Sequence, residues 1–98
     1  MVQVNWTQLA ISDLQKIYYY ISEDSKKYDA LQVLKIREKV KIFRQNPSSG
    51  KHISEFNSDD FRELIEGNYR IIYKIVSEER VDIITIHHSS RDLTSRKI

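Results

Sequence analysis

The last third of the chain constrains the fold most, because its apolar residues alternate with polar ones at the period of a β-strand. Three segments rich in Ile, Val, Tyr and Phe, residues 61–65, 69–76 and 80–88, are separated by short polar stretches at 66–68 and 77–79. Such alternation is typical of half-buried strands, and short connections join neighbouring strands in antiparallel order. The sequence therefore predicts a three-stranded antiparallel meander that needs a cover on one face.

The first half of the chain supplies that cover as two amphipathic helices. Residues 2–6 alternate as a short strand, and the hydroxyl of Thr7 is a candidate N-cap for the helix that follows. The first helix is expected to end near Ser22–Ser25, and Asn46-Pro47 is expected to end the second, because a residue before proline disfavours the α region. Each helix carries one apolar stripe expected to face a common core: Ala10, Leu14, Ile17 and Ile21 in the first, and Val33, Ile36, Val40 and Phe43 in the second.

Helices and strands that are segregated in this way predict an α+β fold. We expect an N-terminal strand and a two-helix hairpin packed on an antiparallel sheet whose last three strands form the meander. The 98 residues suffice for one domain, 1–98. The chain has no cysteine, which suits the cytoplasm, and no apolar run near the roughly 20 residues that span a membrane. Three scattered histidines predict no metal site, and no cofactor is expected.

Positive charge is concentrated in the middle of the chain. Residues 25–52 carry eight Lys and Arg against two acidic residues, so the local charge is 8 − 2 = +6, whereas the whole chain carries +2. A block of this sign attracts phosphate or acidic protein surfaces, although a solvated helix face is the simpler interpretation.

The turn of the first hairpin decides which residues of the meander share a face, because a slip of one residue exchanges every side chain between the faces. A two-residue turn at Gly67-Asn68 mixes apolar and charged side chains on both faces. A three-residue loop at 66–68 separates them better, and it places Arg62 and Arg70 on the face away from the helices. This register puts Glu63 on the core face, where we have no account of it.

The same test on the second hairpin favours a three-residue loop at 77–79. That loop sets Asp82 opposite Lys74 as a cross-strand ion pair and directs His88 to the face away from the helices. Arginine suits phosphate or carboxylate, since its guanidinium is planar and always charged. The simpler alternative is that Arg62 and Arg70 only form ion pairs on a solvated sheet face, with Glu63, Glu66 or Asp82. The predicted functional patch consists of Arg62, Arg70, His88 and, just beyond the last strand, Arg91.

Several segments resemble the RelE/ParE toxin superfamily when they are taken in order. They are FREL at 61–64, GNYRIIYKI at 67–75 and VDIITIHH at 81–88, together with the helix that begins at Trp6-Thr7 and the Asn46-Pro47 ending of the second helix. No short motif among them is specific alone, but the resemblance covers nearly the whole chain. It implies the toxin half of a bacterial type II toxin–antitoxin pair, held inactive by a cognate antitoxin.

The resemblance implies two different activities within that superfamily. RelE-like members cleave mRNA in the ribosomal A site, whereas ParE-like members inhibit DNA gyrase and are not nucleases. Arg70 matches an arginine that the nucleases carry after the turn into this strand, and Arg62 matches a basic residue one strand earlier. The chain departs from the nuclease pattern at three positions, where the nucleases have a basic residue, an arginine and a tyrosine: Leu64, Ser89 and Ser95.

The segment His88-Ser89-Ser90-Arg91-Asp92 resembles the His-x-x-Arg-Asp ending of ParE-like members. It favours a toxin that binds DNA gyrase and breaks no bond itself. A first alternative is a metal-independent endoribonuclease with ribosome and mRNA as partners, in which Arg62 and Arg70 bind the phosphate and His88 transfers protons. A second is a degenerate member that only binds its antitoxin.

Overall fold

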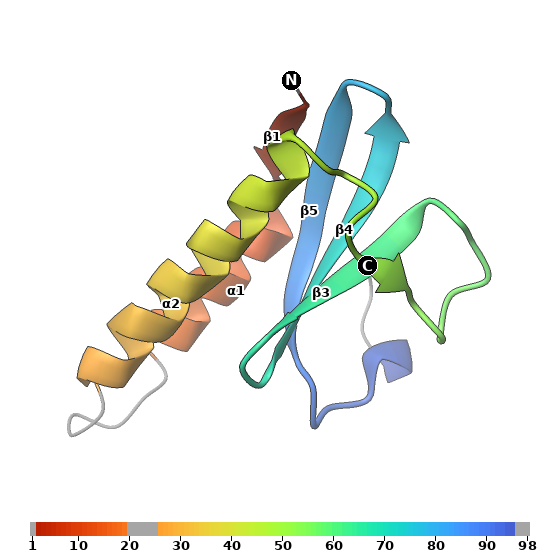
Figure 1. The fold of residues 1–98 in the computed structure, drawn as a ribbon. Coiled ribbons are helices and arrows are strands. Elements are labelled where there is room, and N and C mark those ends of the chain that lie inside the picture. The colour runs from red at the N-terminus through yellow and green to blue at the C-terminus, as the bar shows by residue number, and fades with distance from the viewer. Residues whose placement is uncertain (1, 20–25, 96–98) are drawn as a thin grey trace.

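Two helices lie on one side of a five-stranded sheet in the computed structural model, which describes residues 2–19 and 26–95 (Figure 1). The chain runs from strand to helical hairpin to meander, as expected. Its elements are β1 (Gln3–Trp6), α1 (Gln8–Tyr19), α2 (Lys26–Val40), the 3-10 helix η2 (Lys41–Arg44), β2 (Lys51–His52), β3 (Phe61–Glu66), β4 (Tyr69–Ser77), β5 (Arg80–His88) and the 3-10 helix η3 (Leu93–Ser95).

The strand order of the sheet is β1-β5-β4-β3-β2. The α+β fold and the antiparallel meander of β3, β4 and β5 are confirmed, and β1 adds a parallel strand beside β5. Lys51 and His52 pair with Glu63 and Arg62 as strand β2, which the sequence did not predict. Two residues are too few to show an alternation in the sequence.

The main core lies between the helices and the sheet. Thr7 caps α1 as predicted, since its Oγ accepts a hydrogen bond from the amide of Ala10 at 3.2 Å. The expected end of the first helix at Ser22–Ser25, and Ile21 of its stripe, lie outside the described residues. No helix in the described ranges is long and apolar enough to cross a membrane. The buried members of this core are Ala10, Ile17, Ile36, Val40, Phe43, Ile71, Tyr73, Val81, Ile83 and Ile86.

Asp13 fastens α1 to the sheet at the point where β1 ends. β1 pairs with β5 only as far as Ile83, so the edge of β5 beyond that residue needs another partner. The buried Asp13 carboxylate supplies it, accepting hydrogen bonds from the Thr85 hydroxyl and from the Ile86 amide, the latter at 3.0 Å. The position of α1 is therefore fixed by a polar contact as well as by its apolar stripe.

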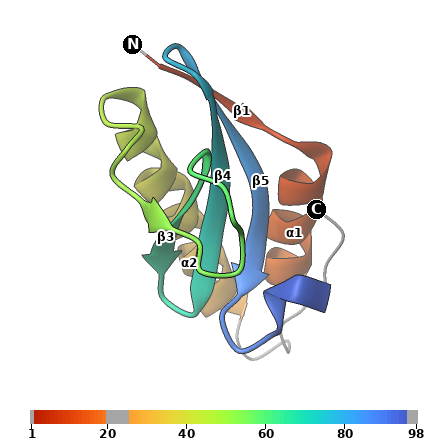
Figure 2. The ribbon, with the colours of Figure 1, turned by 90° about the vertical axis from the view of Figure 1, so that its right-hand side faces the viewer.

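The opposite face of the sheet is covered too, which the sequence did not lead us to expect. The connection between β2 and β3, residues 53–60, crosses this face and is called the strap here (Figure 2). The strap and η3 lie on the side of the sheet opposite the helices (Figure 1). They enclose a smaller core built of Ile53, Ile72 and Leu93 with Phe56, Phe61 and Ile84 at its margin. Both faces of the sheet therefore bury apolar side chains.

The predicted register of the first hairpin was wrong by one residue. Glu66 pairs with Tyr69, so Gly67-Asn68 is a two-residue turn, and Gly67 has a φ of 58°. Glycine with a positive φ at the first turn position fits the type II′ turn that suits the twist of a hairpin. Arg62, paired with Tyr73, therefore faces the helices, and Glu63 faces the strap. The prediction failed because it assumed that only one face of the sheet is buried.

The second hairpin follows the predicted register only near its turn. The backbone of Lys74 lies opposite that of Asp82 as expected, but the Asp82 carboxylate forms its ion pair with Arg80. The turn has two residues, and an irregularity precedes it between Ile75 and Ser77. A bulge then shifts the pairing, because Ile72 pairs with Thr85 whereas Tyr73 pairs with Ile83. The extra residue reverses the remaining side chains. His88 pairs with Tyr69 and lies on the helix side, contrary to the prediction.

Candidate functional site

The four residues of the predicted patch do not share one face of the sheet. Arg70 alone projects from the strap side, whereas Arg62 and His88 project from the helix side, and Arg91 lies in the turn after β5. The prediction that two arginines and a histidine emerge together is therefore wrong. Each residue has to be judged by its own contacts.

Arg62 holds the loop that follows the second helix. Its Nη1 donates a hydrogen bond to the Gly50 carbonyl at 3.1 Å. The buried Tyr73 hydroxyl binds the same loop, because it accepts from the Gly50 amide at 2.9 Å and donates to the Pro47 carbonyl at 2.7 Å. Burial raises the pKa of Tyr73, so this phenol stays protonated and able to donate. These contacts give Arg62 a structural role on the helix side.

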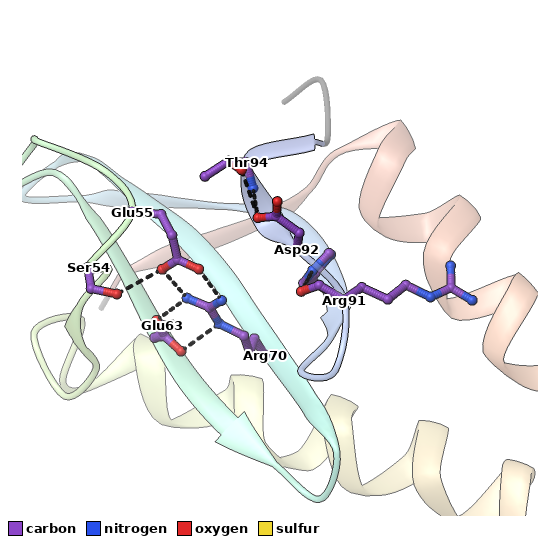
Figure 3. A network of polar contacts seen from close by, with 8 residues as sticks. Ser54, Glu55, Glu63, Arg70, Arg91, Asp92 and Thr94 are labelled. Carbon is purple, nitrogen blue, oxygen red and sulfur yellow. Dashed lines mark hydrogen bonds and ion pairs between the residues drawn. The ribbon is translucent and has the colours of Figure 1, made fainter.

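Arg70 is held between two carboxylates on the strap side (Figure 3). Its Nε and Nη2 donate to the Oε1 and Oε2 atoms of Glu63, at 3.0 and 2.7 Å. Its Nη1 and Nη2 donate to the Oε2 and Oε1 atoms of Glu55, at 2.6 and 2.8 Å. A guanidinium presents two such forked edges to oxygen acceptors, and both are occupied here. We call these three residues the Arg70 cluster.

The Arg70 cluster is largely shielded from solvent and carries a net negative charge. The exposed fractions of its side chains are 12% for Arg70, 5% for Glu63 and 24% for Glu55. Hydrogen bonding to Arg70 lowers the pKa of Glu55 from 4.5 to about 2, so Glu55 is ionised at neutral pH. Hydrogen bonds to Glu55 and Glu63 raise the pKa of Arg70 further. Two carboxylates against one guanidinium leave one negative charge, which opposes phosphate binding.

His88 and Arg91 lie at the far end of the sheet. Nδ1 of His88 lies 3.2 Å from the Ser90 amide and 2.6 Å from the Ser90 hydroxyl, and its ring stands edge-on to Tyr69 with the centroids 5.2 Å apart. Ser89 ties the same turn to the first hairpin through its amide and hydroxyl, which donate to the Asn68 carbonyl at 2.8 and 2.9 Å. Arg91 is exposed and extends away from the Arg70 cluster (Figure 3).

This arrangement does not bring together the groups of a metal-free ribonuclease. That chemistry needs a base, an acid and unoccupied cations around one phosphate. Arg62 and Arg70 face opposite sides of the sheet, and Arg70 already binds two carboxylates.

A cavity of about 350 Å³ adjoins the cluster, lined among others by Lys51, His52 and Ser89. Among the described residues, no three histidine or carboxylate groups gather where they could hold a metal ion.

An apolar groove on the helical hairpin is the second surface with a functional shape. It has a volume of about 420 Å³ and opens between α1 and α2. Arg37 of the basic second helix lies at its wall, where it adds a positive charge to an apolar surface. The side chains that line the groove are those of Trp6, Ile11, Leu14, Gln15, Tyr18, Val33 and Arg37.

The sequence offered the pairing of Arg70 with Glu63 only as the simpler alternative, which the structure confirms, and it gave no indication of Glu55. Glu63 was the available signal, since it had no place in the register that we favoured, and the two-residue turn gives it Arg70 as a partner. Glu55 gave no signal, because it lies in an irregular segment whose path across the sheet has no sequence pattern. The only sequence signal for the groove was the pair Ile11 and Tyr18, which lie beside the apolar stripe of the first helix and line the groove.

Comparisons with known proteins agree with the architecture. The family model described as ParE toxin of type II toxin-antitoxin system, parDE, matches residues 4–93. A solved structure titled "Chromosomal ParDE TA system from P. aeruginosa" aligns with a TM-score of 0.71 and 23% sequence identity, covering 90% of this chain and 96% of the other. At that identity the likeness shows a shared fold. A search of curated protein sequences gave no significant match.

Proposed function

Because the chain belongs to the ParE toxin family of type II toxin–antitoxin systems, we propose that it inhibits DNA gyrase by binding, in the cytoplasm, and that a cognate antitoxin neutralises it. Family membership makes it a toxin component with an antitoxin partner. Gyrase as the target, and neutralisation by the antitoxin, are our proposals. In this proposal the toxin itself breaks no covalent bond.

The state of Arg70 is the observation that carries this proposal. A ribonuclease would need this arginine to stabilise charge on a phosphate, yet both forked edges of its guanidinium bind carboxylates. Arg62 lies on the helix side of the sheet, where it binds a backbone carbonyl. His88 lies on the same side, at the C-terminal end of β5. A toxin that acts by surface contact requires none of these groups to converge.

Within the predicted patch, we propose that Arg91 contacts the target. It is exposed, and its turn is fastened to the first hairpin by Ser89, so the guanidinium projects from a well-supported position. Exposed arginines are frequent energetic anchors of protein interfaces. The inner members of the patch, Arg62 and Arg70, would then support the fold that presents it.

A supercoiling assay with purified gyrase and purified toxin tests the target. We expect loss of supercoiling at excess toxin, and a much weaker effect for Arg91→Glu. Arg80→Glu is the matched control, since Arg80 is another exposed arginine at the opposite end of β5. Full gyrase activity at excess wild-type toxin would refute the proposed target, and equal effects of the two variants would refute the role of Arg91.

The groove between α1 and α2 is the proposed site of the antitoxin. An amphipathic segment fits it best, with apolar residues against Leu14 and Val33 and an acidic residue near Arg37. The positive block of residues 25–52 favours such an acidic partner. Binding to the product of the adjacent reading frame, measured by calorimetry, tests this site.

The groove variant for that experiment is Ile11→Asp, and Val76→Asp is its control. Both side chains are apolar and exposed to a similar degree, 39% and 45%, but only Ile11 lines the groove. We expect affinity to fall at least about tenfold for Ile11→Asp and to stay unchanged for Val76→Asp. Equal affinities would move the antitoxin site elsewhere.

A further inference from the structure

The two carboxylates that bind Arg70 are held in different ways. Glu63 belongs to strand β3 and is almost completely buried, so its position is set by the sheet. Glu55 belongs to the strap, which is irregular, and its side chain is 24% exposed. Glu55 is therefore the outer partner, and it occupies the Nη1–Nη2 edge of the guanidinium.

The strap is held by contacts other than those of Glu55. Ile53 is buried against Ile72, and the Phe56 amide donates to the Ile53 carbonyl at 3.2 Å. The ring of Phe56 stacks edge-on against Phe61 with the centroids 5.3 Å apart. These contacts flank Glu55 on both sides. Loss of its charge should leave the strap in place.

A cavity with donor groups lies beside the edge that Glu55 occupies. It has a volume of about 350 Å³, ample for a phosphate group. Its lining includes the cationic side chain of Lys51, the imidazole of His52 and the hydroxyls of Ser54 and Ser89, besides the Arg70 cluster itself. Without Glu55 the chemistry of this lining suits a small oxyanion.

We propose that Glu55 is a built-in carboxylate that masks Arg70, and that an oxyanion site for phosphate opens in this cavity when the Glu55 charge is removed. A tethered carboxylate competes with external anions at an effective concentration of at least millimolar. It also keeps the cluster negative, which repels phosphate. In the native protein the mask keeps nucleic-acid phosphates off this face of the sheet.

Phosphate titration followed by NMR of the Arg70 Nε–H group tests the mask directly. In the wild-type protein we expect this resonance to stay unshifted at millimolar phosphate. Glu55→Gln and Glu55→Ala should each show a saturable shift and bind phosphate at least about tenfold more tightly. Glu66→Gln is the control: it removes a carboxylate from the same hairpin, but that carboxylate lies on the helix side of the sheet.

Two results would overturn the proposal. One is phosphate binding by the wild-type protein that is as tight as in the Glu55 variants. The other is the absence of tighter binding in both variants while their amide spectra show the native fold. Because gyrase inhibition is proposed to depend on Arg91, the supercoiling assay on Glu55→Gln separates the two proposals. Phosphate binding can refute the mask while gyrase inhibition persists, and gyrase inhibition can be absent while the phosphate titration supports the mask.

Discussion

Replacing Arg70 by methionine should destabilise the protein strongly. Methionine keeps the length and the apolar stem of the side chain, so the change mainly removes the charge and its hydrogen bonds. Glu63, whose side chain is 5% exposed, would then be a buried carboxyl group without its guanidinium partner. Removing one partner of a buried ion pair costs about 3–5 kcal/mol. We expect about 3 kcal/mol at pH 7, the lower end, because Glu55 can turn toward solvent.

Urea unfolding of the wild-type protein and Arg70→Met measures this loss. Arg80→Met is the matched control, because Arg80 also forms a forked pair, with Asp82 at 2.8 and 3.1 Å, but its side chain is 49% exposed. Exposed pairs contribute little to stability, so the control should unfold within error of the wild type. A second variant, Arg70→Met with Glu63→Gln, should recover most of the loss because it removes the uncompensated charge.

The difference between wild type and Arg70→Met should also depend on pH. The folded-state pKa of Glu55 lies at about 2, below its ordinary value of 4.5. A lowered pKa contributes stability that is fully present above 4.5 and is lost as the pH falls toward 2. The variant lacks this contribution, so the two unfolding free energies should converge between these values. Equal losses for Arg70→Met and Arg80→Met, or a difference that grows in acid, would refute this account of the cluster.

Three further substitutions test other contacts, each by urea unfolding. Gly50→Ala should cost about 2 kcal/mol, because its new Cβ would lie 2.6 Å from both the Glu63 carbonyl and the Tyr73 hydroxyl; native stability would contradict this packing. Tyr73→Phe leaves the Gly50 amide without its acceptor and should cost about 1–2 kcal/mol; an unchanged midpoint would show that water replaces the phenol. Asp13→Ala leaves the Ile86 amide without its acceptor, and should cost about 2 kcal/mol and speed amide exchange there.

Most of the fold could be predicted because it rests on periodic patterns. The apolar stripe from Val33 to Phe43 specifies a helix, and the alternation in the last third specifies strands. Thr7 was a reliable cap for a local reason, since it needs only the amide three residues ahead. Helices and strands that are specified by residues close together in the sequence were therefore predicted in the correct order.

The site could not be predicted because it depends on single-residue shifts and on contacts distant in sequence. One residue in the length of the Gly67-Asn68 turn moved Arg62 to the helix side, and one bulged residue moved His88 there too. The preference for separated charged and apolar faces assumed a solvated sheet surface, but the strap covers that surface. No pattern in the sequence around Glu55 indicates that it binds Arg70, which lies fifteen positions away.

Pulse labelling of cells after induction of the toxin tests most directly whether it binds rather than cleaves. Thymidine and leucine incorporation would be followed together with the 5′ ends of cellular mRNAs. If the toxin acts by binding gyrase, we expect DNA synthesis to fall first while mRNAs stay uncut. New 5′ ends within translated codons, appearing as protein synthesis falls and before DNA synthesis does, would contradict the account.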